Sequence, residues 1–145
     1  MRYALFVTPS SRQHMTAFHL DLVSPEKLSF AGDVEQVDLP GSEGDMGVLA
    51  GHAPLVTALR PGIITIFREG SDLRFVVNGG FAEVGPGGLT ILADRAVARA
   101  DFDMATLATE IKEAEEDVVD ATDQAVRDKL VRHLDQLKAL QAALA

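Results

Sequence analysis

The side chains with the clearest chemical potential lie in a glycine-rich segment, residues 41–55. It reads Gly-Ser-Glu-Gly-Asp-Met-Gly-Val-Leu-Ala-Gly-His-Ala-Pro-Leu and carries Glu43, Asp45 and His52. Two carboxylates and an imidazole can act as a general acid and base where a cleft shifts their pKa values. Carboxylates two positions apart in a glycine loop are usually solvated, and the sequence indicates no such cleft. Because glycine permits tight bends, we expect a loop that presents these side chains for binding.

Other motifs that carry chemistry are missing from the sequence. The chain has no cysteine, which excludes a thiolate metal site, a cysteine nucleophile and a disulfide. Its four histidines are scattered without metal-ligand spacing, and neither a phosphate-binding loop nor a Gly-x-Ser-x-Gly elbow is present. Residues 85–88 are rich in glycine, but the lysine of a phosphate-binding loop is missing. We therefore expect a turn at this segment. We therefore expect no catalytic residue, no metal and no cofactor.

The charge and hydropathy of the chain restrict its partners. The net charge is −9, whereas binding to a nucleic-acid duplex needs a basic face. No apolar run approaches the roughly 18 residues of a membrane span, and the longest, residues 63–67, has the length of a strand. We expect no nucleic-acid partner and no direct membrane insertion, so any membrane association must depend on another protein.

Residues 18–93 have the periodicity of β-strands. Apolar and polar residues alternate through residues 18–22 and again through 73–77, which is typical of half-buried strands. A change of phase after Val34 predicts a β-bulge near residues 35–36. Turn signals recur at 24–25, 40–41, 61–62, 69–70, 79–80 and 86–88. Their spacing predicts an antiparallel β-sandwich or flattened barrel of about ten strands.

The composition changes to that of helices after residue 100. Residues 101–145 contain no glycine or proline and are rich in alanine, leucine and charge. Weak helix formers at 120–124 predict a turn between two helices, and Asp101 or Asp103 is placed to cap the first helix. Two apolar stripes follow a helical period: Met104, Leu107, Ile111, Ala114 and Val118, then Val126, Leu130, Leu134, Leu137 and Leu144.

The start of the chain stands apart from this pattern. Residues 1–14 carry two arginines and no acid, and they lack the apolar core of a secretory signal. Met15 offers an alternative start, so we interpret residues 1–16 as a dispensable N-terminal extension. The expected organisation is this extension, a β-sandwich domain at 17–100 and a C-terminal α-helical hairpin at 101–145.

Four motifs follow one another along the chain in residues 18–26 (FHLDLVSPE), 41–55, 78–84 (NGGFAEV) and 89–96 (LTILADRA). Together they resemble the epsilon subunit of bacterial F-type ATP synthases. The resemblance implies a non-catalytic β-sandwich at the foot of the central rotor, linking the gamma subunit to the c-subunit ring. It implies a peripheral position at the cytoplasmic face of the inner membrane.

The resemblance also suggests which residues meet these partners. It places Glu43, Asp45 and Met46 at the c-ring and His52 at the neighbouring gamma subunit. The helical hairpin would be a regulatory arm that folds beside the sandwich or extends along gamma to block ATP hydrolysis, with the catalytic alpha and beta subunits as further candidate partners. The arm residues suited to an acidic partner are Arg127, Lys129, Arg132 and Lys138. By itself, the sorting of charges on the two helices favours the simpler alternative, which is ordinary solvated helix faces with weak ion pairs between the helices.

One family motif is degenerate in this chain. Some epsilon subunits bind ATP at the start of the hairpin through an aliphatic residue, Asp, two variable residues and Arg-Ala. Asp103 is kept, but Thr106 and Leu107 replace the arginine and alanine. Without the guanidinium fork that holds a phosphate, we expect no ATP binding. The alternative function is a nucleotide-sensing module; a carbohydrate-binding or enzymatic sandwich is weaker, because the chain has no tryptophan and no paired acid site.

Overall fold

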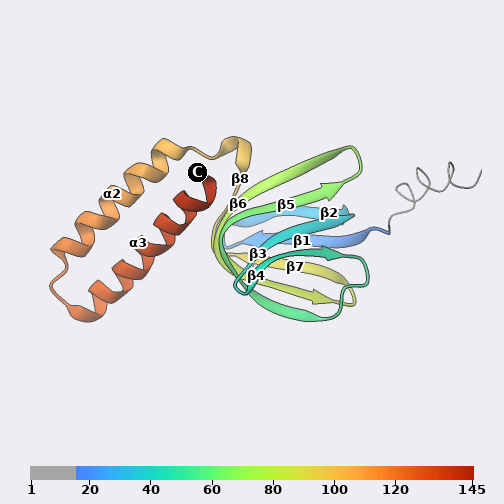
Figure 1. Cartoon of the computed structure of the whole chain (residues 1–145), viewed down its shortest axis with the longest axis horizontal. Coiled ribbons are helices and arrows are strands. Elements are labelled where there is room, and N and C mark those ends of the chain that lie inside the picture. Colours follow the sequence, from blue (N-terminus) through green and yellow to red (C-terminus); the bar gives the residue numbers. More distant parts are fainter. Residues whose placement is uncertain (1–15) are drawn as a thin grey trace, which may run out of the picture.

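A computed structural model describes residues 16–145, in which strands precede helices (Figure 1). The strands are β1 (Phe18–Ser24), β2 (Lys27–Val34), β3 (Gln36–Gly41), β4 (Gly44–Leu49), β5 (Leu55–Arg68), β6 (Ser71–Gly85), β7 (Gly88–Ala93) and β8 (Ala96–Ala98). A short 3-10 turn, η1 (Arg99–Asp101), leads to α2 (Met104–Asp120) and α3 (Gln124–Leu144). The predicted fold class, a β-sandwich followed by a helical hairpin, is confirmed. The predicted extension, residues 1–16, lies outside the described residues apart from Thr16.

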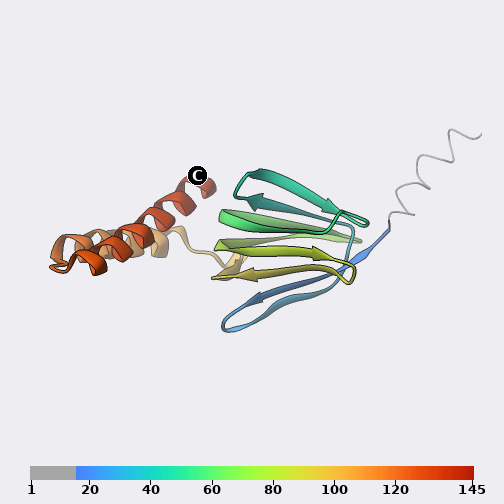
Figure 2. The same ribbon diagram turned by 90° about the horizontal axis from the view of Figure 1, so that it is seen from below.

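The strands form one hydrogen-bonded path that folds into two layers. Its order is β2-β1-β7-β6-β5-β3-β4, and β8 pairs with β6. Strands β1 and β7 run parallel, and the other pairs of this path are antiparallel. The long strands β5 and β6 curve at the end nearest the helices and so take part in both layers (Figures 1 and 2).

The described chain has eight strands, fewer than the predicted ten, because two turn signals lie inside long strands. Pro61 and Gly62 belong to β5, and Gly79 and Gly80 belong to β6. These two dipeptides lie side by side on neighbouring strands, because Pro61 is opposite Asn78, the residue before Gly79. Gly80 has a φ of 132°, and a Cβ there would collide with the Leu92 carbonyl oxygen. These residues therefore bend continuous strands instead of ending them.

The change of phase after Val34 is a break between strands, so the predicted bulge is wrong. Strand β2 ends at Val34, which is opposite Phe18 of β1. Strand β3 starts at Gln36, which is opposite Phe67 of β5. The chain changes partners at Glu35, whose amide donates to the Phe67 carbonyl oxygen at 2.8 Å. The apolar phase shifts because the two strands belong to different parts of the sheet path.

Two hydrophobic clusters meet at adjacent residues of β6. The first fills the sandwich and includes Ile64 and Ile66, each 0% exposed. The second lies between the helices and is formed by Leu107, Ile111, Ala114, Leu134, Leu137 and Leu140, together with Val76. Successive strand side chains point to opposite faces, so Val77 joins the sandwich cluster while Val76 joins the helical one. The hairpin thus packs on the outside of β6.

The predicted hairpin turn is confirmed, with one difference in the second stripe. Helix α2 ends at Asp120 and α3 begins at Gln124. Val126, near the turn, is 49% exposed, whereas Leu140, outside the predicted stripe, is 1% exposed. The buried positions shift toward the C-terminus because that half of α3 lies between α2 and strands β5 and β6. Neither helix is long and apolar enough to cross a membrane.

Candidate functional site

Glu43 lies at the tip of the hairpin turn that joins β3 to β4. Gly41 and Gly44 are opposite each other at the end of the ladder, and Ser42 and Glu43 form the exposed two-residue loop. Gly44 has a φ of 135°, a conformation that favours glycine. A Cβ on Gly41 would lie 2.8 Å from the Gly44 carbonyl oxygen. The two glycines thus allow a tight turn that determines where Glu43 is presented.

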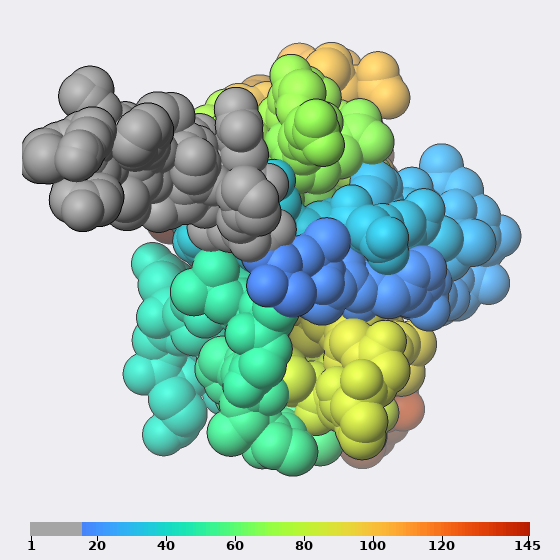
Figure 3. Space-filling view, turned by 90° about the vertical axis from the view of Figure 1, so that its right-hand side faces the viewer, coloured from blue at the N-terminus to red at the C-terminus, as the bar shows by residue number. Residues whose placement is uncertain are grey.

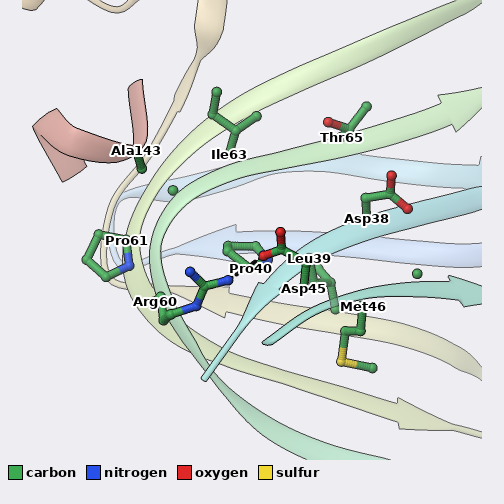
Figure 4. A pocket seen from close by; sticks show the side chains of 12 residues that line it. Asp38, Leu39, Pro40, Asp45, Met46, Arg60, Pro61, Ile63, Thr65 and Ala143 are labelled. Atoms are coloured by element: carbon green, nitrogen blue, oxygen red, sulfur yellow. Dashed lines mark hydrogen bonds and ion pairs between the residues drawn. The ribbon is translucent and has the colours of Figure 1, made fainter. Parts of the chain in front are cut away.

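An arginine on β5 contacts both strands of this turn. The Nε of Arg60 donates a hydrogen bond to the Gly41 carbonyl oxygen at 2.7 Å, and its Nη2 pairs with the Asp45 carboxylate (Figure 4). The Asp45 side chain is 87% exposed, and exposed pairs contribute only about 0–1 kcal/mol. The contacts therefore orient the turn more than they stabilise the fold. Sequence reasoning missed Arg60, because it lies 15 residues from Asp45 and only the β3–β5 pairing brings them together.

A hollow of about 630 Å³ lies between this turn, the bend of β5 and the end of α3. Its lining combines the charged Asp38, Asp45 and Arg60 with apolar residues that include Met46 and Ala143 (Figure 4). Met46 is only partly exposed and packs against the sandwich core. The structure therefore brings the predicted ring-facing residues to one end of the sandwich, but it gives Met46 a packing role there.

His52 lies away from this turn, beyond the other end of β4. The whole of β4, Gly44–Leu49, separates it from Glu43. Its Nδ1 lies 2.8 Å from the Ala53 carbonyl oxygen, and its side chain lines a hollow of about 530 Å³ with Phe18, His19 and the turn at 85–88. Figure 3 shows this end, with the chain after β4 (teal) near the start of β1 (blue). Within residues 16–145, no three His, Asp or Glu side chains group as a metal site would.

The two residues of the degenerate ATP motif cap a helix. Asp103 is the N-cap of α2, and its carboxylate accepts hydrogen bonds from the Thr106 hydroxyl at 2.8 Å and the Ala105 amide at 3.0 Å. The hydrogen bond from Thr106, followed by that from Ala105, lowers the pKa of the Asp103 carboxyl below its ordinary value of 3.8. Of the two predicted caps, Asp103 is therefore the one used, and Thr106 contributes to capping.

Arg95, between β7 and β8, fills the space beside this cap. Its Nη1 lies 3.1 and 3.4 Å from the two carboxylate oxygens of Glu110 on α2. A hollow of about 170 Å³ remains between Arg95, Asp103, Thr106 and Glu110. Asp101 also lines the hollow. Arg95 is paired with Glu110, and Asp103 with Thr106, so these contacts fasten the start of α2 to the sandwich.

The four basic residues predicted for the arm have different surroundings. The Nζ of Lys138 lies 3.6 Å from Glu115 on α2, and Arg127 donates to the C-cap carbonyl oxygen of α2 at 2.6 Å. Arg132 lines a groove beside the β5 bend, and Lys129 is exposed. Lys138 and Arg127 are thus engaged within the hairpin, which leaves Lys129 and Arg132 as the more available cations.

Sequence reasoning missed an exposed apolar patch on the outer face of the sheet. Val56, Phe81 and Leu92 are 65%, 58% and 55% exposed. Phe81 is opposite both Leu92 on β7 and Ala58 on β5, and Leu92 is opposite Val23 on β1. Residues opposite each other, and residues two apart on one strand, share a face. Val56, two residues before Ala58 and opposite the exposed Glu83, therefore lies on the same face as Phe81 and Leu92, and the patch spans four strands. Exposed patches of this kind mark interaction surfaces. The sequence does contain a sign of this patch, because apolar residues occupy positions that the strand alternation places on the outer face.

Comparisons with known proteins agree with this architecture. Residues 17–99 match the family described as "ATP synthase, Delta/Epsilon chain, beta-sandwich domain". The ATP synthase epsilon chain of Afipia carboxidovorans is 50% identical over 127 residues, which cover 88% of this chain and 93% of the relative. That of Parvibaculum lavamentivorans is 52% identical over 124 residues, which cover 85% and 94%.

Solved structures show the same relationship. A chain of the Euglena gracilis mitochondrial ATP synthase, in a structure of OSCP, F1 and the c-ring, is 32% identical with a TM-score of 0.70, covering 89% of this chain and 82% of that one. A chain of the Tetrahymena thermophila central stalk and c-ring shares the fold, with a TM-score of 0.60, 13% identity and coverage of 90% and 98%. The resemblance predicted from the four motifs is confirmed. The chain therefore belongs to the family of ATP synthase epsilon chains.

Proposed function

We propose that this chain acts as the epsilon subunit of the ATP synthase central stalk, linking gamma to the c-ring and coupling proton translocation to ATP synthesis. It performs no catalysis itself. The observation that carries the proposal is the family match, and the two surfaces described above suit its two contacts. The subunit would be peripheral, at the cytoplasmic face of the inner membrane.

The apolar patch of Val56, Phe81 and Leu92 fits a lasting contact with gamma. A stalk subunit must stay attached while torque passes through it, and apolar cores are characteristic of permanent interfaces. The patch spans β1, β7, β6 and β5, so it is supported by paired strands and not by a loop. His52, beyond the far end of β4, is a further candidate for contact with gamma.

The charged turn of Glu43 and Asp45 fits contact with the ring. It lies at the end of the β3–β4 ladder, and both acids are exposed. A contact made by rim charges is salt-sensitive and mainly sets the association rate and register. This suits a joint that must align the sandwich on the ring.

We propose that residues 101–145 are a regulatory arm that can leave the sandwich domain of residues 17–100. When the arm is folded, α3 packs against Gly79 of β6, which has no side chain. A Cβ at this position would come within 3.3 Å of Gln136 Nε2 on α3. Val76 and the Arg95–Glu110 pair complete the junction. Once the arm is released, Lys129 and Arg132 would be available to acidic surfaces of the alpha and beta subunits.

The nucleotide-sensor alternative is not favoured. Asp103 and Thr106 are occupied in capping α2, and Arg95 is paired with Glu110. No free guanidinium therefore stands at the motif position to hold a phosphate.

Co-purification with gamma tests the proposal. The double variant Phe81→Asp with Leu92→Asp should abolish recovery of gamma, because it places two charges in the apolar patch. Both side chains are more than half exposed, so the subunit should still fold. The matched control is Val119→Asp on α2, where an apolar side chain is 79% exposed outside the patch. Retention of gamma by the double variant would remove the patch from the interface, and failure of the unmodified chain to bind gamma would refute the stalk role.

A further inference from the structure

The folded arm has little apolar contact with the strands of the sandwich. The second hydrophobic cluster includes Leu134 and Leu137 of α3, but it takes a single buried residue, Val76, from the strands. Figure 1 shows the end of α3 beside the bend of β5 and β6. Because the hydrophobic effect is not directional, one such contact does not by itself decide where α3 lies along β6. A second point of contact is needed to set that position.

Gly79 provides this second point, further along β6. Its φ is 91°, and the position that a Cβ would take lies 3.3 Å from Gln136 Nε2 on α3. The same position lies 3.1 Å from Asp94 Oδ2 and 3.8 Å from the Leu59 carbonyl oxygen. The missing side chain of Gly79 therefore leaves a notch in the sandwich, and the Gln136 side chain reaches this notch from the arm.

The sandwich surrounds the notch with hydrogen-bond acceptors. Asp94 and Leu59 present a carboxylate and a carbonyl oxygen to it. Asn78 directly precedes Gly79, and its side-chain oxygen is buried with no hydrogen-bond partner among residues 16–145. Asn78 is two residues after Val76, so it points to the side of the strand that the arm covers. An amide nitrogen carries two donors, which makes the Gln136 nitrogen the complementary group.

We infer that Gln136 is a positioning residue, which sets where α3 docks by placing its side-chain amide nitrogen in the notch at Gly79. The consequence for regulation rests on the proposed function. Helix α2 has its own polar contact with the sandwich, since Arg95 pairs with Glu110. Each helix of the arm then has one polar contact of its own, and α3 leaves the sandwich only when Gln136 leaves the notch.

Substitutions of Gln136 in the full chain test the polarity of this contact. Gln136→Glu nearly keeps the shape but brings a carboxylate to the acceptors of the notch. It should speed amide exchange in residues 124–144 by about tenfold, the upper end for a lost hydrogen bond. Gln136→Met removes the donor without adding charge and should have a smaller effect. The matched control is Gln141→Glu, an exposed glutamine of the same helix, which should leave exchange unchanged.

A change of size at Gly79 tests the location of the contact. Gly79→Ala places a methyl group 3.3 Å from Gln136 Nε2 and should displace α3. Gly70→Ala is the matched control, because Gly70 has a φ of 95° and no atom lies within 4 Å of its Cβ position. In a Gln136→Ala background, Gly79→Ala should displace α3 no more than Gly70→Ala does. Spin labels at Asp72→Cys and Asp128→Cys of this cysteine-free chain measure the displacement.

Two results would overturn the inference. Equal exchange in Gln136→Glu and Gln141→Glu would mean that the Gln136 amide does not position α3. Displacement by Gly79→Ala that persists in full without the Gln136 side chain would mean that another group occupies the notch. If Gly79→Ala does not fold, the two Gln→Glu variants decide the matter, because neither changes the sandwich. Failure of the unmodified chain to bind gamma concerns the proposed function alone and leaves these measurements unaffected.

Discussion

The sandwich and the helical hairpin differ in how their cores are closed. In the sandwich, layers built on two bent strands enclose side chains such as Leu20, Ile64 and Ile91, each 0% exposed. In the hairpin, a smaller cluster lies between two helices and is completed by one sandwich residue, Val76. A core enclosed on all sides resists local opening, whereas a helix pair with one buried stripe depends on its docking. The difference supports the proposal that residues 101–145 form an arm that can leave the sandwich.

The largest effect is expected in the sandwich core. Ile64→Ala removes buried methyl groups and leaves a cavity, so it should lower the free energy of unfolding by about 2–5 kcal/mol. Urea denaturation measures this change. Val119→Ala, at a position that is 79% exposed, should change the same quantity by less than about 0.5 kcal/mol. Similar losses in both variants would mean that the burial pattern described here does not determine stability.

A local effect is expected in the hairpin. Leu137 is 1% exposed in the second cluster, so Leu137→Ala should speed amide exchange in residues 104–144 by about tenfold or more. Exchange in residues 18–98 should stay unchanged, because the sandwich has its own cluster. Leu137→Met, which nearly conserves volume, is the control. Equal acceleration in both halves would show one cooperative unit and would contradict a detachable arm.

A smaller, pH-dependent effect is expected where the halves join. The pKa of Asp103 is lowered by its hydrogen bonds from Thr106 and Ala105. A lowered folded-state pKa means that the cap contributes above the unfolded value of 3.8 and is lost as the pH falls through the folded pKa. The chemical shift of the Ala105 amide proton should follow this loss. Asp103→Asn also caps helices but does not titrate, so its shift should stay constant over the same range.

No effect is expected from ATP. A ligand at 100 times its dissociation constant would add about 2.7 kcal/mol to the free energy of unfolding. Since Asp103 and Thr106 are used in the cap, the melting temperature should not rise with ATP. Inorganic triphosphate is the control for nonspecific anion effects. A rise with ATP but not with triphosphate would restore the nucleotide-sensor alternative.

Local patterns predicted most of the architecture but misjudged some boundaries. Alternation and the apolar stripes identified the sandwich and the hairpin, and weak helix formers located the turn before Gln124. Pro61 and Gly79 were misread as turn residues, because the same residues that make turns also bend long strands. Leu140 was missed because α3 is buried mainly where it meets the sandwich, which helical periodicity does not reveal.

The sequence by itself determined the fold class, the family and the glycines that shape the β3–β4 turn. These depend on residue type and short-range spacing, which are visible along the chain. Only the tertiary structure decided that Asp45 is paired with Arg60, that His52 lies far from Glu43, and that Phe81 and Leu92 form one patch. Those relationships depend on which strands pair and in what register. Pairing is set by packing among residues distant in sequence, and a single sequence contains no direct record of it.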